Sequence, residues 1–469
     1  MRGKIIRMFL LLIGSLVLFA CQPATVAEED VVSETVSTQI KTSEPIREPT
    51  QVMEFVTQQP ALNSDIISLW HPFSGQEAET IDILVSRFNE EDYQVEVVAT
   101  SFADNEVFIE AVLSAAENGM LPDLIIGPSP FLHTMMRQSD LAMIDAEQEI
   151  SLIDNFEGNM FPAFWGLDVD DGERFGVPYL QHGSFLFYNS EWAQELGFVD
   201  KPSNPEEFRS QTCMAFNQNR FDNVIENDGT GGYFYPADPI AFLSWLRAFN
   251  GGLEFNNRGE IILTTSENED AIKYLFRLFV DDCAWWTNKQ DTPFLYFKNR
   301  NSMTYSGWSQ DMLFQTRVML EAENNDTWLP ISYPSVDGKP IVYFENYSFA
   351  IIEKNGVNTD TMLPFIQWMV QPDQHLEMVY QTAAFPLTAI EIQEADETWG
   401  LLPVWRETLQ YIPFLEPLPN TTGWYYAEKI LDDLRWQIIQ FGVTEESLST
   451  YLEEAESLGN SMILNNTVD

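Results

Sequence analysis

Apolar residues between 66 and 127 alternate between strand-like and helix-like spacing. Short apolar runs predict three strands, at 66–70, 93–100 and 122–127. Between them, apolar residues recur every three or four positions at 78–88 and 108–115, which predicts two helices. The unit is βαβαβ, and its parallel strands place their carboxyl ends along one edge, where ligands of such sheets bind. We therefore expect a site around the loops 70–75, 101–104 and 127–131.

Polar residues at the starts of the predicted helices indicate where each helix begins. Ser74 with Glu77 forms a capping-box pattern, and Asp104 is the expected N-cap of the second helix. Asp238 followed by Pro239 has the same capping role later in the chain. Residues 184–189 and 303–305 read as further strands, and the second breaks at 306–309. Trp245, Trp285, Trp286 and Trp368 lie on or beside apolar helical faces, which predicts core packing.

The first 64 residues do not resemble a folded domain. Three basic residues precede the apolar run 8–20, which is too short for a bilayer that needs about 20 residues, so 1–20 is an expected export signal. The segment resembles bacterial lipoprotein signals, and this resemblance implies lipidation of Cys21. A soluble secreted form and an uncleaved anchor remain the alternatives. Residues 21–64 are polar and aperiodic, so a disordered tether is predicted.

The net charge excludes some binding partners, and the length of the chain indicates the number of lobes. Removing residues 1–20 lowers the formal net charge from −48 to −51, because this segment holds three basic and no acidic residues. A protein this acidic lacks the clustered Lys and Arg that bind nucleic acid. The acidity is typical of a soluble surface. The part after the tether is long enough for two lobes.

The sequence carries no metal, cofactor or catalytic signature. Four histidines without HxxxH or CxxC spacing give no metal site, and no nucleotide-binding glycine motif or GxSxG elbow is present. We therefore predict no cofactor and no enzyme. Outside the cytoplasm, Cys213 and Cys283 favour a disulfide, with two buried free thiols as the alternative.

Taken in order, several short segments resemble the solute-binding proteins of ABC sugar importers, the group with the maltodextrin-binding and glycerol-phosphate-binding proteins. The resemblance covers roughly 65–461. It rests on the lipoprotein leader and on the segments 69–75 (LWHPFSG), 121–125 (LPDLI), 177–179 (VPY), 186–189 (LFYN), 306–309 (SGWS), 346–351 (NYSFAI), 364–369 (PFIQWM) and 443–448 (VTEESL).

The resemblance implies an α/β, two-lobed periplasmic-binding-protein-like fold with a ligand cleft and a hinge of crossing strands. Lobe 1 would comprise 65–178 and 334–370, lobe 2 would comprise 179–333 and 371–461, and 462–469 would be a tail. The chain would cross between lobes near Tyr179, Tyr333 and Val370. The expected protein is a monomeric, membrane-anchored receptor outside the cell that captures a carbohydrate by hinge closure and delivers it to a permease.

Sugar sites combine aromatic faces with polar side chains. Trp308 stands where the family places a stacking tryptophan. The other candidate ligand-binding residues are Trp70, His71, Ser74, Asp104, Ser129, Gln181, His182, Tyr235, Asp238, Tyr347 and Trp424. The loop 127–131 departs from maltodextrin-binding relatives, because Ser129 is its only hydroxyl.

Two other functions remain open. One is a receptor of the same fold for a glycerol phosphodiester, which would need Arg or Lys near the ligand, or for a polyamine, which would need several carboxylates. The other is a surface enzyme acting on glycans, or an adhesin, on the same fold.

Overall fold

The computed structural model describes residues 65–466, apart from 92, 94, 139, 146–147, 149–151, 153–159, 236–237, 288–292, 355–358, 399–402 and 422. The expected export signal, Cys21 and the tether lie outside these residues. Residues 62–469 form one compact unit. Within the described part, no helix combines the length and the apolar character needed to cross a bilayer.

The βαβαβ unit predicted from the sequence is present. It comprises β1 (Asp65–His71), α1 (Gly75–Glu90), β2 (Val95–Ser101), α2 (Asn105–Asn118) and β3 (Leu124–Pro128). Strand β1 lies between β2 and β3 and is parallel to both. The carboxyl ends of all three strands therefore share one edge, as expected.

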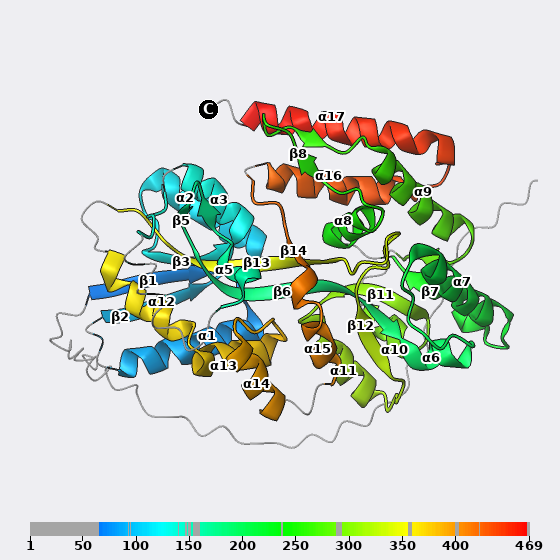
Figure 1. The fold of residues 1–469 in the computed structure, drawn as a ribbon, viewed down its shortest axis with the longest axis horizontal. Helices are drawn as coiled ribbons and strands as arrows, with labels where there is room; N and C mark the ends of the chain where they lie inside the picture. The colour runs from blue at the N-terminus through cyan, green and yellow to red at the C-terminus, as the bar shows by residue number, and fades with distance from the viewer. Residues whose placement is uncertain are drawn as a thin grey trace, which may run out of the picture. The chain divides into compact units, whose positions relative to one another are not determined.

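The unit is one half of a ten-stranded mixed sheet. Its main path runs β10-β7-β11-β6-β13-β3-β1-β2 (Figure 1). The remaining strands of this sheet are β6 (Val177–Asn189), β7 (Gly231–Phe234), β10 (Ala284–Trp285), β11 (Ser302–Trp308), β12 (Trp328–Ile331), β13 (Val342–Ile351) and β14 (Leu415–Pro417). Two short hairpins, β4–β5 (Val169–Asp170, Glu173–Arg174) and β8–β9 (Glu254–Phe255, Ile261–Ile262), lie apart from the sheet.

Strand β6 joins the two halves of the sheet. Its first part pairs with β13, which is bonded to β3, and its second part pairs with β11 and β12. The sequence predicted a strand only over 184–189, whereas the structure extends it back to Val177, through Pro178. The pairing of β6 with β13 is irregular opposite Pro178, where a proline cannot donate a ladder hydrogen bond.

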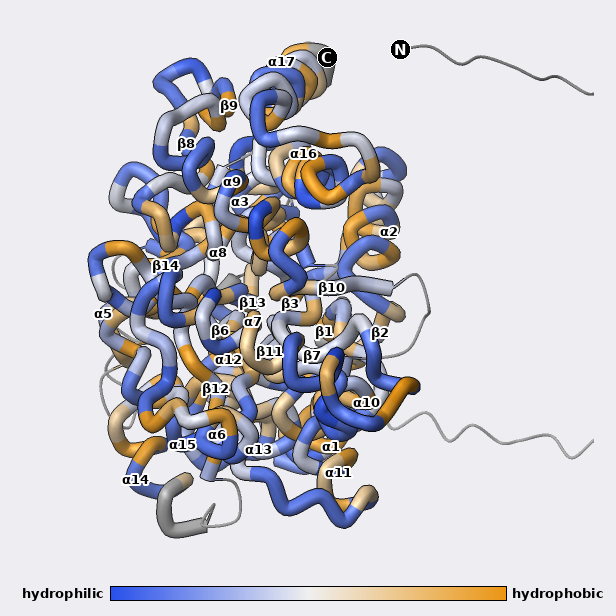
Figure 2. The backbone as a smooth tube through the Cα atoms, turned by 90° about the vertical axis from the view of Figure 1, so that its right-hand side faces the viewer, coloured by the Kyte–Doolittle hydropathy of each residue, from blue (hydrophilic) through white to orange (hydrophobic). Residues whose placement is uncertain are grey.

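Helices cover both faces of the sheet (Figure 1). Apolar and hydrophilic residues are interleaved along outer helices such as α2 and α16 (Figure 2), as expected for helices that bury one side. The remaining helices are α3 (Ser129–Arg137), α5 (Pro162–Trp165), α6 (Ser190–Glu195), α7 (Pro205–Phe221), α8 (Pro239–Ala248), α9 (Ser266–Val280), α10 (Pro293–Lys298), α11 (Asp311–Glu321), α12 (Leu363–Met369), α13 (Pro372–Thr382), α14 (Ala389–Thr398), α15 (Pro403–Leu409), α16 (Trp424–Gln437) and α17 (Leu448–Asn466).

The late helices are divided between the two halves of the sheet. Helix α16 packs against α8 and α17, beside the half that contains β7 and β11. Helix α13, which the sequence assigned to lobe 2, packs against α1 instead. Its buried residues Met378 and Val379 show that it contributes an apolar face to this packing. We therefore place the final crossing after α13 rather than at Val370.

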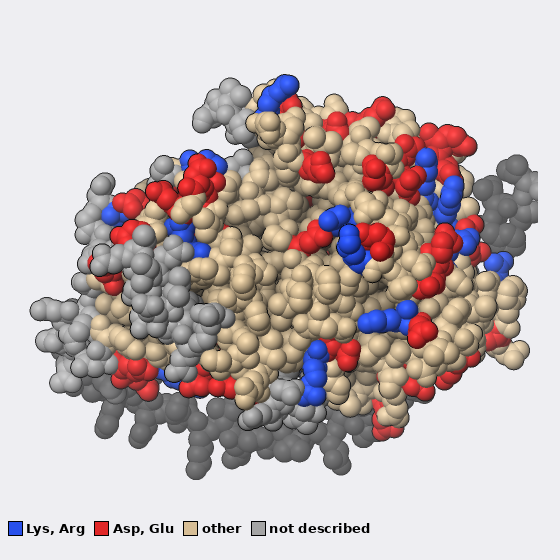
Figure 3. Space-filling view, viewed as in Figure 1, with Lys and Arg blue, Asp and Glu red and all other residues tan. Residues whose placement is uncertain are grey.

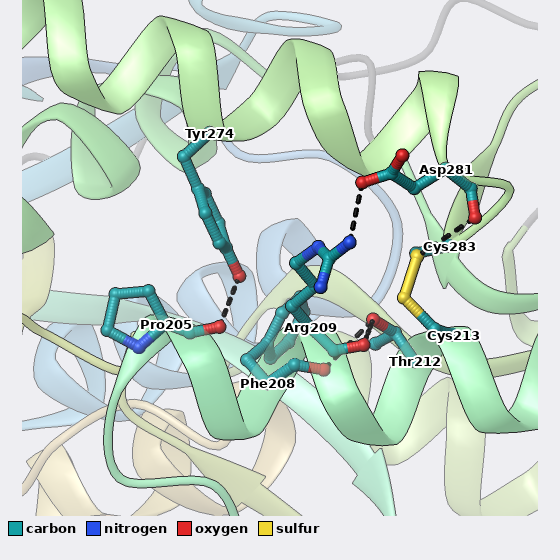
Figure 4. Close-up of a disulfide and its surroundings, with 8 residues drawn as sticks. All are labelled: Pro205, Phe208, Arg209, Thr212, Cys213, Tyr274, Asp281 and Cys283. Atoms are coloured by element: carbon teal, nitrogen blue, oxygen red, sulfur yellow. Dashed lines mark hydrogen bonds and ion pairs between the residues drawn. A yellow bond between two sulfur atoms is a disulfide. The ribbon is translucent and has the colours of Figure 1, made fainter.

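A disulfide joins Cys213 of α7 to Cys283, next to β10 (Figure 4). Two further contacts hold the same elements together. Arg209 on α7 donates a 2.6 Å hydrogen bond to Asp281, and the Tyr274 hydroxyl of α9 donates one of 2.8 Å to the Pro205 carbonyl. The bridge therefore fastens the first helix of this half to the edge of its sheet.

Candidate functional site

The carboxyl ends of strands from the two halves face each other along β6. Pro128, at the end of β3, lies beside Tyr347, which pairs with Leu180 of β6. From the other half, Trp308 at the end of β11 pairs with Ser184 of β6. Residues 181–183 of β6 lie between these ends. We call this stretch, with the strand ends and loops that face it, the junction.

Glu345 occupies the middle of the junction. It pairs with His182 across the antiparallel strands β13 and β6, so both side chains project from the same face of the sheet. Tyr347 follows two positions later on that face and donates a 3.3 Å hydrogen bond to Glu345 Oε2. The Tyr347 hydroxyl in turn accepts a 2.8 Å bond from Asn105, the first residue of α2. The loop after β2 therefore reaches the junction through Asn105.

Trp308 is held by Asp311 and lies close to Asp238. Its backbone N–H donates a 2.8 Å hydrogen bond to Asp311, at the start of α11. Asp238, the N-cap of α8, accepts a 2.8 Å bond from the backbone of Ile240. Burial raises the pKa of Asp238, and the nearby Trp308 side chain partly offsets this rise. Trp308 itself is half-buried, so part of its ring remains accessible. Asp238 thus serves as a helix cap beside Trp308.

Carboxylates from four helices and one strand influence one another here. Burial raises the pKa of Glu345 to about 8, and the charges of Glu428, Asp238 and Glu77 raise it further. Burial also raises the pKa of Glu77 to about 7 and that of Glu428 to about 7. It raises the pKa values of Asp238 and Asp311 to about 6. We call these five residues the carboxylate cluster.

Two buried imidazoles stand next to this cluster. His182 is 2 % exposed; its Nδ1 lies 3.1 Å from Ser309 Oγ, and its Nε2 has no hydrogen-bond partner among the described residues. His71 is fully buried, and within the same part of the chain neither of its ring nitrogens has a partner. The ring of His71 stacks on Phe73, whose ring contacts Tyr347. Burial lowers the pKa of His71 to about 4 and that of His182 to about 3, so both are neutral at pH 7.

Gln181 belongs to a different network, because alternation along β6 directs it away from His182. Its amide donates a 2.8 Å hydrogen bond to Asn346, which donates to Ser129 at 2.5 Å and to Asp168 at 3.1 Å. All four side chains are buried. The predicted candidates Gln181 and Ser129 therefore link β6, β13 and the start of α3 through an internal network.

The other predicted residues take mainly structural positions. Trp424 and Tyr235 are buried in the core of the β7–β11 half, and the Tyr235 hydroxyl donates to the Arg435 carbonyl. Trp70 packs on Phe102, with ring centroids 5.1 Å apart. Asp104 caps α2 by accepting a bond from Val107. Ser74 is the N-cap of α1 but makes no side-chain capping bond, so the predicted capping box is not formed.

The structure adds junction residues that the sequence did not single out: Glu77, Asn105, Asp311, Glu345 and Glu428. One signal was available for Glu345, an acidic residue within the otherwise apolar and aromatic run 342–347. The remaining acids stand among 72 Asp and Glu residues without distinctive spacing. Many acidic side chains spread over the face seen in Figure 3, so acidity alone does not mark the site.

Among the described residues, no group of three His, Cys, Asp or Glu side chains is arranged to hold a metal ion. The junction instead offers hydrogen-bond acceptors, an aromatic face and neutral imidazoles. Such a set recognises a ligand that combines apolar faces with many hydrogen-bond donors.

Comparison with known proteins places this arrangement among binding proteins. A model of the family of bacterial extracellular solute-binding proteins matches residues 84–399. An arabinooligosaccharide-binding protein of Halalkalibacterium halodurans is 26% identical over 209 residues, and the match covers 44% of this chain and 44% of that protein. The chain therefore spans less than half the length of this curated relative.

Solved structures share the fold at low sequence identity. The sugar-binding protein MalE of Xanthomonas citri superposes with a TM-score of 0.73 at 14% identity, covering 86% of this chain and 100% of that chain. The cyclic alpha-maltosyl-1,6-maltose binding protein of Arthrobacter globiformis gives a TM-score of 0.67 at 17% identity, covering 86% of this chain and 100% of that one. These likenesses show a common two-lobed fold.

Proposed function

The chain belongs to the bacterial extracellular solute-binding proteins, and from this premise we propose that it captures a saccharide at the junction and delivers it to an ABC importer permease. The observation that carries the proposal is the position of Trp308. It stands half-buried at the carboxyl end of β11, opposite Ser184 of β6 and next to Asp238 and Asp311. Sugar rings offer C–H faces to such a ring and hydroxyl donors to the carboxylates around it.

Strands β6 and β13 would form the hinge about which the two halves close. Because β6 pairs with both halves of the sheet, small changes in its backbone near 181–183 would rotate one half against the other. A ligand that contacts Tyr347 on one side and Trp308 on the other binds the closed form better than the open form, which is sufficient to drive closure. The proposal includes no turnover, so the ligand should be recovered unchanged after incubation.

We predict that Trp308→Ala weakens saccharide binding about 30-fold, equivalent to roughly 2 kcal/mol for loss of a central aromatic contact. Isothermal titration of the variant and the parent protein checks this. Phe441→Ala serves as the control, because Phe441 is fully exposed and lies outside the junction. Affinity within twofold of the parent in a folded Trp308→Ala protein would show that Trp308 does not contact the ligand.

The anchor and the oligomeric state are part of the same proposal. Lipidation of Cys21 would hold the protein on the outer side of a membrane while residues 22–64 let the folded part reach the permease. We predict that Cys21→Ala moves the protein from the membrane fraction to the soluble exported fraction. A variant that stays with the membrane would rule out Cys21 as the anchor.

A monomer is expected by size-exclusion chromatography with light scattering.

A further inference from the structure

We infer that the ligand presents at least one protonated amino group to the carboxylate cluster, so that the receptor selects an amino-bearing oligosaccharide over its neutral counterpart. This inference rests on the proposed function. It specifies the chemistry of the ligand at that same site.

The first argument is the charge balance around Glu345. Glu77 comes from α1, Asp238 from the start of α8, and Glu428 from α16, and each acts electrostatically on Glu345. Asp311 in turn feels the charge of Asp238. Two basic groups act on the cluster, Arg435 on Asp238 and Lys429 on Glu428. The five carboxyl groups of the cluster are therefore accompanied by only these two basic side chains.

Neither cation is free to neutralise Glu345. Arg435 donates two hydrogen bonds to Asp432 and lies over the ring of Trp436. Lys429 is exposed, donates a 2.5 Å hydrogen bond to Tyr425 and lies 4.2 Å from that ring's centroid. Asp432 adds another negative charge near Glu428. The protein's own cations therefore do not balance these carboxyl groups, and Glu345, whose pKa is raised to about 8, keeps a proton at pH 7 rather than a counter-charge.

The second argument is independent of the acids and comes from the imidazoles. His182 is directly opposite Glu345 on the same sheet face and has one unpartnered nitrogen, while both nitrogens of His71 are unpartnered. A buried polar atom without a partner is unfavourable unless a ligand or water satisfies it. As neutral rings, each offers one acceptor nitrogen and adds no positive charge. The imidazole nitrogens at the junction thus lack hydrogen-bond donors, and the carboxyl groups lack positive charge. An ammonium group on the ligand would supply both.

A hydroxyl group would meet only part of this need. It donates one hydrogen bond to a carboxylate but leaves the repulsion among neighbouring carboxylates unchanged. Charge-assisted hydrogen bonds from an ammonium are about twice as strong as neutral ones. Closure of the two halves removes water from these acids and increases their mutual repulsion, which favours a cationic ligand further.

Ammonium groups occur on amino sugars and on aliphatic polyamines. The half-buried Trp308 favours a sugar ring, which has a face to stack. The test therefore compares glucosamine oligosaccharides with their N-acetylated forms of equal length, neutral gluco-oligosaccharides and spermidine. Acetylation removes the charge but adds an acetyl group, so the neutral gluco-oligosaccharide of equal length, which has a hydroxyl in place of the amine, serves as the size-matched control.

Calorimetric titration of the full protein should show at least about tenfold tighter binding of the amino oligosaccharide than of its acetylated form. Glu345→Gln should reduce this preference to about threefold or less, measured as the ratio of the variant's own affinities for the two forms. Glu453→Gln, on an exposed position of α17, serves as the matched control and should change neither. Glutamine has nearly the same size as glutamate, so Glu345→Gln should fold. Its thermal unfolding midpoint checks this.

The direction of proton exchange provides a second readout. A cation favours the charged form of the carboxyl groups, so its binding lowers their pKa values and releases protons. Titration of the amino ligand at about pH 6, where its own amine is still protonated, should therefore release protons to the buffer. A neutral ligand that only excludes water would cause proton uptake instead.

Each outcome leads to a distinct conclusion. Equal or tighter binding of the neutral sugars, or proton uptake with the amino form, overturns this inference but leaves saccharide capture intact. Binding of spermidine alone would keep the ammonium chemistry and overturn saccharide capture. If none of the probes binds, both the inference and the proposed function fail.

Discussion

Replacing His375 with alanine is expected to lower the free energy of unfolding by roughly 3–5 kcal/mol. His375 Nδ1 lies 2.9 Å from Glu391 Oε2, and its Nε2 lies 2.6 Å from the Tyr179 carbonyl oxygen. The Tyr179 carbonyl is an acceptor, so Nε2 donates to it, while Nδ1 and the Glu391 carboxyl group share one hydrogen bond. The two side chains are fully buried. Removing the histidine would leave a buried carboxyl group and a backbone carbonyl without their hydrogen-bond partner.

Urea unfolding of the parent protein and His375→Ala measures this effect. The control is the double variant His375→Leu with Glu391→Met, because replacing both members of a buried hydrogen-bonded pair by apolar groups of similar shape can be close to neutral. We expect the double variant to recover most of the lost stability. A single variant that loses less than about 1 kcal/mol would contradict this account. The result matters for the hinge, since Tyr179 lies in the first part of β6.

Removing the disulfide is expected to lower the free energy of unfolding by about 4 kcal/mol. The bridge between Cys213 and Cys283 closes a loop with a sequence separation of 70 residues, and a loop of this length restricts the unfolded chain strongly. The double variant Cys213→Ala with Cys283→Ala, unfolded in urea, measures the loss. Alanine at both positions avoids leaving a free thiol that could pair with another molecule.

Reduction provides the matched control for the disulfide. A reducing agent should destabilise the parent protein to the level of the double variant and have no effect on the double variant itself. Mass spectrometry of the unreduced parent should show the two cysteine peptides linked. Equal stability of the parent protein with and without reducing agent, or two alkylated thiols, would contradict the bridge.

The sequence predicted elements whose apolar spacing is regular and missed those that depend on pairing between distant segments. The βαβαβ unit follows from local spacing and was correct in order and type. Strand β6 is buried on both faces along its whole length, so it shows no alternation that could mark its start. Gly183, within it, is required because a Cβ there would lie 2.7 Å from the Phe185 ring and 2.9 Å from the Phe385 ring.

Individual tryptophans show the same limit. Trp245 is fully buried and Trp368 is 8% exposed, as the helical apolar pattern predicts. Trp286 was also expected in the core but is 41% exposed and packs edge-on against Trp436 of α16. Helix α16 lies more than 100 residues after Trp286 in the sequence. The local spacing of apolar residues around Trp286 therefore cannot predict that α16 packs beside it.

The candidate site was predictable in place but less so in its residues. The loops after β1, β2 and β3 and the end of β11 do meet at the junction. The side chains that reach it from the first two loops are Glu77 and Asn105, each a few positions from the predicted Ser74 and Asp104. Helix caps and ligand sites use the same polar residue types, so position within a loop does not decide which role a residue takes.

The central claim is that this protein captures a saccharide at the junction. A thermal-shift screen of residues 22–469 against mono- and oligosaccharides, neutral and amino-bearing, with glycerol phosphates and spermidine as comparisons, tests it most directly. A saccharide at 100 times its dissociation constant should stabilise the protein by roughly 2.7 kcal/mol, and the about 30-fold weaker binding of Trp308→Ala should reduce this to roughly 0.9 kcal/mol at the same concentration. A shift with phosphates alone, or no shift with any saccharide, would contradict the claim.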